Sequence, residues 1–332
     1  MSIDETLPIE VRRGSMIESL HHVDVAVSDA AGTDVLTRGD RDRMIYARSA
    51  SKPVQALPLI ESGAAEHFAL SDERIALACA SHRGEPVHTE NVGRWLGDIG
   101  LGEPSLECGP HRPNDLATAD ALVACGEQPT RLHNNCSGKH TGFLTTAVHL
   151  GEDPAGYLAE SHPVQQRVTQ VLSEMSGVDL ASTPRGEDGC GIPVIGMPLG
   201  GLARAVAQMA DPRSQGAARG AACGRIVASM ARHPYLTAGR DRLDTALMSA
   251  VAGIGTKTGA EGVHIAIVPW KKIGIAVKAR CGSERAADAA ILWALVQTGV
   301  ISETAGRALS EWIERAVTNT LGHTVGSVRA GD

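Results

Sequence analysis

The chain has 332 residues, of which 43% are apolar and 21% charged, and its formal net charge is −7; this composition is typical of a globular protein with one large domain or two packed lobes. Charges of both signs are mixed along an acidic chain, which argues against nucleic acid and membrane surfaces as partners. No run of about 18 apolar residues predicts a membrane-spanning helix, and the first residues lack the pattern of a signal peptide, so we expect a cytoplasmic protein.

Strands and helices are predicted in successive groups. Short strands with β-branched and apolar residues open the chain, at residues 8–13, 16–20, 22–28, 34–37 and 43–47. Helical periodicity follows, at residues 53–62, 88–97, 116–124, 139–150, 163–176, 199–210, 216–232 and 241–252. The last group has strands and then helices, at 262–269, 273–279, 284–298 and 302–316. The glycine-containing tail after Asn319 is expected to fray.

This order predicts an α/β protein of the α+β type. Strand groups from the two ends of a chain commonly pair into one antiparallel sheet that is flanked by helices. Residues 1–50 and 255–332 would form the sheet domain, and residues 51–254 a mainly helical lobe inserted between them.

Lysine is rare in this chain, because only six of the 31 basic residues are lysine. A buried lysine can lose its proton and act as a base or a metal ligand, whereas arginine stays charged. Three of the six lie in short motifs with serine, cysteine or threonine: Lys52, Lys139 and Lys257. These three motifs are therefore the first candidates for chemistry.

The first motif is Ser49-x-x-Lys52, at the junction between a predicted strand and a predicted helix. A serine needs a base to become a nucleophile, and residues three apart at a helix start face the same side. A neutral lysine at that spacing can accept the serine proton. The alternative is a helix-capping serine followed by a surface lysine.

The second motif is Lys257-Thr258-Gly259, just before a predicted strand pair. Together with Ser-x-x-Lys it is similar to the motif set of serine β-lactamases and penicillin-binding proteins. Gly259 would let a substrate approach the strand closely, and Ser81, after an apolar stretch, is the candidate for the middle serine of such a set. The absence of a Ser-Asp-Asn tripeptide speaks against a true β-lactamase, and a solvated turn is the alternative reading.

The third candidate joins Cys136 and Lys139 with Cys190, which lies in a downstream glycine-rich loop. Thiolates bind Zn²⁺ well, and a catalytic type of site keeps a position open for water or substrate. The spacing is not that of a zinc finger, and a lysine ligand would have to be neutral. His140 is another possible ligand. A thiol at a helix N-terminus and a packed turn are the alternatives for the two cysteines.

Five stretches in this order together resemble one family. They are Arg48-Ser49-Ala50-Ser51-Lys52-Pro53, Cys79-Ala80-Ser81-His82, Asn135-Cys136-Ser137-Gly138-Lys139-His140, Asp188-Gly189-Cys190-Gly191-Ile192-Pro193 and Thr256-Lys257-Thr258-Gly259. The chain resembles the L-asparaginase II family of the rhizobial type. The resemblance implies a serine β-lactamase- and glutaminase-like fold, a cytosolic homodimer, and hydrolysis of L-asparagine to L-aspartate and ammonia.

The resemblance also implies roles for individual residues. Ser49 would be the nucleophile with Lys52 as its partner, and Ser81 with Lys257 would form a second pair. One Zn²⁺ per chain would be held by the family's three ligand positions, which are Cys136, Lys139 and Cys190 here. The residues that line the substrate site would be Arg48, His140 and Asp188.

Three other readings stay open at this point. The same fold can act on glutamine or on a β-lactam. A metallohydrolase would use zinc-bound water as the nucleophile, with Ser49 as a binding group only. A non-catalytic sensor of an amino acid or of zinc is a different class, although a sensor has no need of a neutral lysine.

Overall fold

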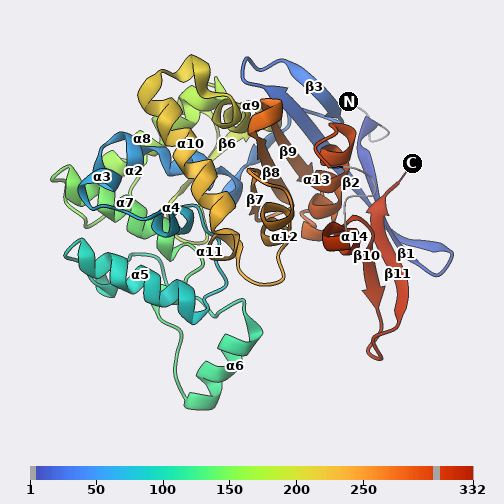
Figure 1. Cartoon of the computed structure of the whole chain (residues 1–332), viewed down its shortest axis with the longest axis horizontal. Coiled ribbons are helices and arrows are strands. Elements are labelled where there is room, and N and C mark those ends of the chain that lie inside the picture. Colours follow the sequence, from blue (N-terminus) through green and yellow to red (C-terminus); the bar gives the residue numbers. More distant parts are fainter. Residues whose placement is uncertain (1–4, 302–306, 332) are drawn as a thin grey trace.

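The computed structural model describes residues 5–301 and 307–331. Its main element is an eight-stranded antiparallel sheet in the order β10–β11–β1–β2–β9–β8–β7, with β3 paired to the second half of β2 (Figure 1). The strands are β1 (Leu7–Arg13), β2 (Met16–Asp29), β3 (Asp34–Arg38), β7 (Gly255–Gly259), β8 (Val263–Val268), β9 (Ile273–Ala279), β10 (Arg315–Thr318) and β11 (Thr324–Ala330). The predicted pairing of strands from both ends of the chain is confirmed.

The centre of the sheet is covered on both faces. Every residue of β8 is buried, as are six of the seven in β9, which requires a layer on each side because side chains alternate along a strand. The helices α9 (Leu199–Ala210) and α13 (Glu284–Gln297) both pack against β2, β8 and β9. This helix–sheet–helix core confirms the α+β class and gives the edge strand β7 a rigid support.

The segment between the two strand groups is mainly helical, as predicted. Apart from α9, which packs on the sheet, it lies beside the sheet and runs from blue through green and yellow to orange in Figure 1. Its helices are α1 (Lys52–Gln55), α2 (Leu57–Glu61), α3 (Ala64–His67), α4 (Asp72–Ala78), α5 (Pro86–Asp98), α6 (Leu116–Cys125), α7 (Ser137–His149), α8 (Pro163–Ser176), α10 (Ala217–Arg232), α11 (Pro234–Ala238) and α12 (Leu243–Ala250). Within the two described ranges, none of the helices combines the length and the apolar character that crossing a membrane requires.

Two local predictions are corrected by the structure, and a third is confirmed with a partner that was not foreseen. The helix expected over 53–62 is two short helices, α1 and α2, because Pro58 in the first turn of α2 has no N–H to continue α1. The strand expected at 43–47 exists as β4 (Met44–Tyr46), but it pairs with β6 (Pro193–Pro198) in a separate small sheet with β5 (Arg185–Glu187). The expected strands at 16–20 and 22–28 are one continuous strand.

The end of the chain differs most from the prediction. A helix was expected over 302–316, of which 302–306 lie outside the described residues; among the described residues the helix α14 covers Arg307–Ile313, and residues 315 and 316 belong to β10 instead. The tail after Asn319, which was expected to fray, instead contains β11, which pairs with β10 just before it and with β1 from Ile9–Ala330 to Arg13–Gly326. The pairing satisfies the outer edge of β1, which short-range propensity does not reveal.

Candidate active site

The Ser49 turn and the Lys257 strand lie directly against each other. Ser49 belongs to the 3₁₀ turn η2 (Arg48–Ser51), which packs on β7. A Cβ atom on Gly259 would lie 2.7 Å from the carbonyl oxygen of Ala47 and 3.0 Å from the amide nitrogen of Ala50. Glycine is therefore needed so that the serine turn, rather than only a substrate, can approach the strand.

Lys52 is buried and its ammonium group points at the second serine. Its Nζ donates to Ser81 Oγ at 2.9 Å and to the carbonyl oxygen of Ala80, and it lies 3.2 Å from Cys136 Sγ. Ser49, half-buried, has no hydrogen bond from its hydroxyl to any residue described in the structure. The direct Ser–Lys contact here thus links Lys52 with Ser81, and the catalytic roles of both predicted pairs stay predictions.

Lys257 lies in β7 and is almost completely buried. Its Nζ donates to the carbonyl oxygen of Thr258 at 2.7 Å. Burial lowers the pKa of Lys257 to about 7, helped by the positive charges of Lys52 and Arg242 and opposed by the negative charge of Asp244. A substantial share of this lysine is therefore a neutral amine near neutral pH, as a general base requires.

A buried polar network supports the Lys257 strand from behind. Asp244 accepts hydrogen bonds from Thr256 Oγ1 at 3.2 Å and from Thr258 Oγ1 at 2.5 Å. His264 lies between two carboxylates, with Nε2 3.1 Å from Asp244 Oδ1 and Nδ1 3.0 Å from Asp288 Oδ1. Burial alone would lower the pKa of His264, but the two carboxylates raise it to about 9, so the imidazole is a cation at neutral pH. Sequence analysis missed this network because its parts are far apart in the chain.

The three predicted zinc ligands converge in the structure. Lys139 Nζ lies 3.0 Å from Cys190 Sγ. A hydrogen bond with Cys190 and the nearby charges of Lys52 and Lys139 hold the pKa of Cys136 well below its usual range, despite burial. The same hydrogen bond and burial raise the pKa of Cys190. Two sulfur atoms and one amine in a buried place suit a Zn²⁺ ion.

A lysine is essential to this donor set. Among residues 5–301 and 307–331, no three His, Cys, Asp or Glu side chains come together as a metal site. The nearby thiol groups raise the pKa of Lys139, although burial opposes this. A metal ion would therefore have to displace a proton from Lys139 on binding.

The three residues predicted to line a substrate site lie around the same cluster. Arg48 has a positive φ of 49°, and its Nε donates to Asp188 Oδ1 at 2.7 Å. His140 is fully buried, and its Nδ1 lies 2.6 Å from Tyr157 Oη. Its Nε2 has no hydrogen-bond partner among the described residues, and burial keeps the pKa of His140 well below its usual value. A neutral imidazole nitrogen thus remains available beside Lys139.

An open cavity of about 370 Å³ is lined by both serines. This volume falls within the range of small-molecule sites, roughly 300–1,000 Å³. The cavity is lined by Ser49, Ser81, Arg83, Asn114, Asn135, Arg242, Thr258, Gly259, Ala260 and Glu284. Arg83 and Asn135 adjoin predicted motifs, and that adjacency was a usable signal. Arg242 and Glu284 carry no local signal, since tertiary packing alone brings them to the cavity.

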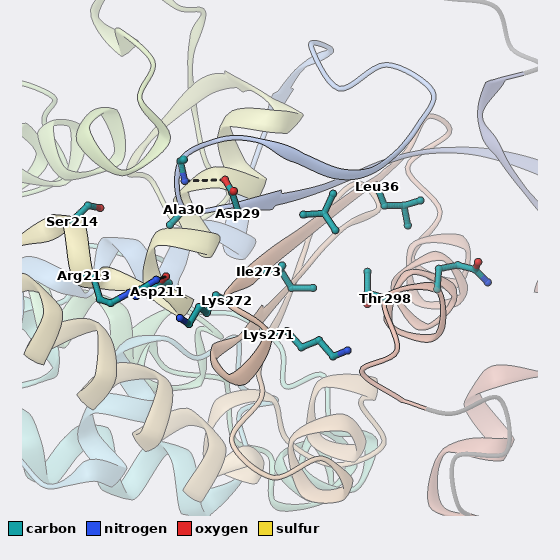
Figure 2. Close-up of a pocket in the computed structure, with 13 residues that line it drawn as sticks. Asp29, Ala30, Leu36, Asp211, Arg213, Ser214, Lys271, Lys272, Ile273 and Thr298 are labelled. Carbon is teal, nitrogen blue, oxygen red and sulfur yellow. Dashed lines mark hydrogen bonds and ion pairs between the residues drawn. The ribbon is translucent and has the colours of Figure 1, made fainter.

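A second, larger hollow of about 900 Å³ lies between the β2–β3 hairpin and the turn that joins β8 to β9. Figure 2 shows its lining, which includes Lys271, Lys272 and Arg213 as well as the apolar Ile273 and Leu36. None of the predicted site residues is part of this lining. Size alone therefore does not identify the active site, whereas the two serines and the buried lysines do.

Comparisons with known proteins identify the family to which the chain belongs. No curated protein sequence matches the chain. Among solved structures, the crystal structure of Mglu is 16% identical over 90% of this chain and 72% of its own, with a TM-score of 0.47. A β-lactamase from Mycobacterium bovis is 14% identical over 84% and 95%, with a TM-score of 0.36. Simvastatin synthase LovD from Aspergillus terreus is 10% identical over 78% and 87%, with a TM-score of 0.39. The sequence profile of the L-asparaginase II family matches residues 9–330, and the chain belongs to this family.

Proposed function

We propose that this protein is an L-asparaginase that hydrolyses L-asparagine to L-aspartate and ammonia through a serine nucleophile. The observation that carries the proposal is that Ser49 and Ser81 line one open cavity next to two buried lysines. Lys52 donates to Ser81, and Lys257 lies in the strand that packs on the Ser49 turn. The family profile supports the amide as the bond that is cleaved.

In the proposed reaction, Ser49 Oγ attacks the side-chain carbonyl carbon of asparagine. The serine proton passes to a neutral lysine amine, and Lys257 has a pKa, about 7, that provides one. The amide nitrogen takes up that proton as the C–N bond breaks, and ammonia leaves. Water then adds to the β-aspartyl ester, which gives aspartate and restores the serine hydroxyl.

Lys52 and Ser81 assist this proton transfer in our proposal. The hydrogen bond from Lys52 Nζ to Ser81 Oγ keeps the lysine amine and the second serine in one chain of donors and acceptors. The charge of Lys52 also lowers the pKa of Lys257. Two ammonium groups in one buried site repel each other, so one lysine is favoured in its neutral form.

We further propose one Zn²⁺ per chain, held by Cys136, Lys139 and Cys190. When bound, the ion would supply a Lewis acid that holds polar groups of the substrate. The converging sulfur and amine donors and the unpartnered Nε2 of His140 support this assignment. Arg48, His140 and Asp188 would border the substrate beside these ligands.

The family likeness also leads us to propose a homodimer that works in the cytoplasm. The seven cysteines make no disulfide among the described residues, and five of them are buried, which suits a reducing compartment. Light scattering of the purified protein tests the dimer, and a single-chain mass at micromolar concentration contradicts it.

The proposed function is tested by ammonia release from asparagine and from glutamine, and in parallel by the colour change on ring opening of a chromogenic β-lactam. We expect asparagine to be the best substrate and Ser49→Ala to lose activity by several orders of magnitude. Ser161→Ala is the matched control, because Ser161 is exposed and belongs neither to the motifs nor to the lining of the cavity. Mass spectrometry of quenched enzyme should reveal a β-aspartyl ester on Ser49.

Other outcomes of this experiment point to other functions. Better turnover of glutamine or of the β-lactam reassigns the substrate while keeping the serine mechanism. Near-normal activity of folded Ser49→Ala, with activity lost after removal of zinc, identifies a metallohydrolase. Binding of asparagine without release of ammonia identifies a sensor.

A further inference from the structure

Two residues that line the open cavity form an ion pair, and neither of them belongs to a predicted motif. Arg242 Nη1 donates to Glu284 Oε1 at 2.6 Å, and both residues line the cavity with Ser49 and Ser81. Arg242 directly precedes α12, and Glu284 is the first residue of α13. A positive and a negative group are therefore held side by side on two helix starts that face the candidate nucleophile.

Arg83 adds a second guanidinium to the same cavity. One of its terminal nitrogens donates to the carbonyl oxygen of Asn114, while its buried Nε has no hydrogen-bond partner among the described residues. Gly239, with φ of 89°, makes room for this side chain, since a Cβ there would lie 2.7 Å from Arg83 Cγ. The aliphatic part of the Arg83 side chain is thus held in place, and its Nε can still donate a hydrogen bond.

These three charged groups match the two charged groups of an amino acid. A free α-amino acid carries a carboxylate and an ammonium group on one carbon atom. A guanidinium has five N–H donors and a carboxylate has about four acceptor positions, so the contact between Arg242 and Glu284 leaves most of both groups unused. The cavity therefore offers cations for a carboxylate and an anion for an ammonium group.

We propose that Arg242 and Arg83 bind the α-carboxylate of the substrate and that Glu284 binds its α-ammonium group. The side-chain amide of the amino acid then extends toward Ser49. This inference rests on the proposed amidase function and adds to it the part of the site that recognises a free α-amino acid.

A second ion pair lies beside a hollow that is too small to bind the α-carboxylate and α-ammonium groups of an amino acid. Arg48 and Asp188 form a contact of 2.7 Å that resembles the pair in the open cavity. The hollow that they line has a volume of only about 10 Å³, which is too small for an amino acid. Arg48 and Asp188 do not line the larger cavity, so we assign the α end of the substrate to Arg242, Arg83 and Glu284 instead.

The test uses three amides that differ only at the α-carbon. L-Asparagine has both charged groups, succinamate lacks the ammonium group, and 3-aminopropanamide lacks the carboxylate. Loss of a charge-assisted hydrogen bond weakens binding by about 10- to 100-fold. We expect Arg242→Gln to raise KM by this factor for asparagine and succinamate, with little change for 3-aminopropanamide. Glu284→Gln should raise KM for asparagine and 3-aminopropanamide but not for succinamate.

Arg213→Gln is the matched control, because Arg213 forms an exposed ion pair of 2.6 Å with Asp211 outside this cavity. An equal rise in KM for all three amides in Arg242→Gln and Glu284→Gln overturns the proposal, as does no rise at all. The proposal is also overturned if the substrate-selective pattern appears in Arg48→Gln and Asp188→Asn instead.

Binding measurements separate this inference from the proposed function. Calorimetry on Ser49→Ala reports affinity for the same three amides without turnover. If the wild type releases no ammonia but the selective binding pattern is present, the asparaginase assignment fails and the recognition site stands. If ammonia is released but the pattern is absent, the recognition site fails alone. If asparagine neither binds nor reacts, both are wrong.

Discussion

The open cavity beside Ser49 and the thiol cluster around Lys139 are neighbours with opposite physical character. The cavity has about 370 Å³ of space and charged walls, whereas Cys136, Lys139 and Cys190 are all buried. The first region has room for an organic molecule, and the second offers buried sulfur and amine atoms for the zinc ion that we propose. Lys52 touches both, since its Nζ lies 2.9 Å from Ser81 Oγ and 3.2 Å from Cys136 Sγ. A change in one region is therefore expected to reach the other through this lysine.

The largest expected effect comes from the residue that joins the two regions. Lys52→Arg should be nearly as damaging as Lys52→Ala, with a loss in kcat of about 10²- to 10⁴-fold, because arginine keeps the charge that acts on Lys257 but cannot exchange a proton with Ser81 in the proposed transfer chain. Steady-state ammonia release measures this effect, and circular dichroism confirms folding. If Lys52→Arg retains most of the activity, Lys52 acts only through its charge.

A smaller effect is expected from the thiol cluster itself. Cys136→Ser should carry far less than one zinc per chain and should raise KM for asparagine by roughly tenfold, because a serine hydroxyl is a poor zinc ligand. Metal analysis and kinetics measure the two effects, and zinc affinity of the wild type should rise with pH. Cys125→Ser, at an exposed cysteine, is the control, and Ser49→Ala should keep its zinc. Full zinc content in Cys136→Ser would show that the cysteines serve packing alone.

The pH dependence of kcat/KM tests the role of Lys257 at the open cavity. Lys257 must be neutral to act as a base, so activity should fall as the pH drops below its pKa of about 7. Asp244 raises this pKa, and Lys52 and Arg242 lower it, while Cys136 also raises it. Asp244→Asn removes a negative charge and should move the acid limb to lower pH by roughly one unit. Asp288→Asn, one step further along the network, should move it less; a shift to higher pH excludes Lys257 as the titrating base.

The smallest effect concerns stability. The pKa of His264 is raised from 6.5 to about 9, so its stabilisation is complete below pH 6.5 and is lost as the pH rises through 9. The pKa of Lys257 is lowered from 10.5 to about 7, so its burial destabilises the fold below pH 7 and this penalty disappears toward pH 10.5. The two slopes oppose each other, each reaching at most about 1.4 kcal/mol per pH unit.

Urea denaturation at several pH values separates the two groups. In Lys257→Met the free energy of unfolding should decrease between pH 6.5 and 9, and in His264→Gln it should increase from pH 7 upward. The wild type should be nearly flat between pH 7 and 9. Parallel curves for all three proteins would mean that neither group changes its protonation on folding.

Residues close together in sequence were the predictable part of the site. The spacing of Ser49 and Lys52 and the Lys257-Thr258-Gly259 tripeptide are local patterns, and the structure brings them together. Arg242, Glu284 and the network of Asp244, His264 and Asp288 have no such pattern, because helix starts and a neighbouring strand bring them together only in the folded chain. Even the partner of Lys52 depended on tertiary structure, since Ser81 lies on another segment.

The fold, like the site, could be predicted where residues close together in the sequence determine it. Periodicity predicted most helices and the central strands because burial on one or both faces leaves a pattern along the chain. The last strands were missed because β10 and β11 are stabilised by pairing with each other and with β1, and not by their own composition. The break between α1 and α2 depended on the position of a single proline, Pro58.

The order of strands in the sheet also has a consequence for synthesis of the protein. β2 pairs with β9, so that Val23 meets Ala279, and β1 pairs with β11. A growing chain can therefore pair the apolar half of β2 with β3 on one side, but it lacks β9 on the other side while the whole helical segment is being made. Strands that are far apart in the sequence pair slowly, and until they pair their apolar, unpaired edges are exposed and prone to aggregation. We expect nascent chains that stop before β9 to remain sensitive to protease in about their first 40 residues. We also expect them to depend on a chaperone until β9 has been synthesised.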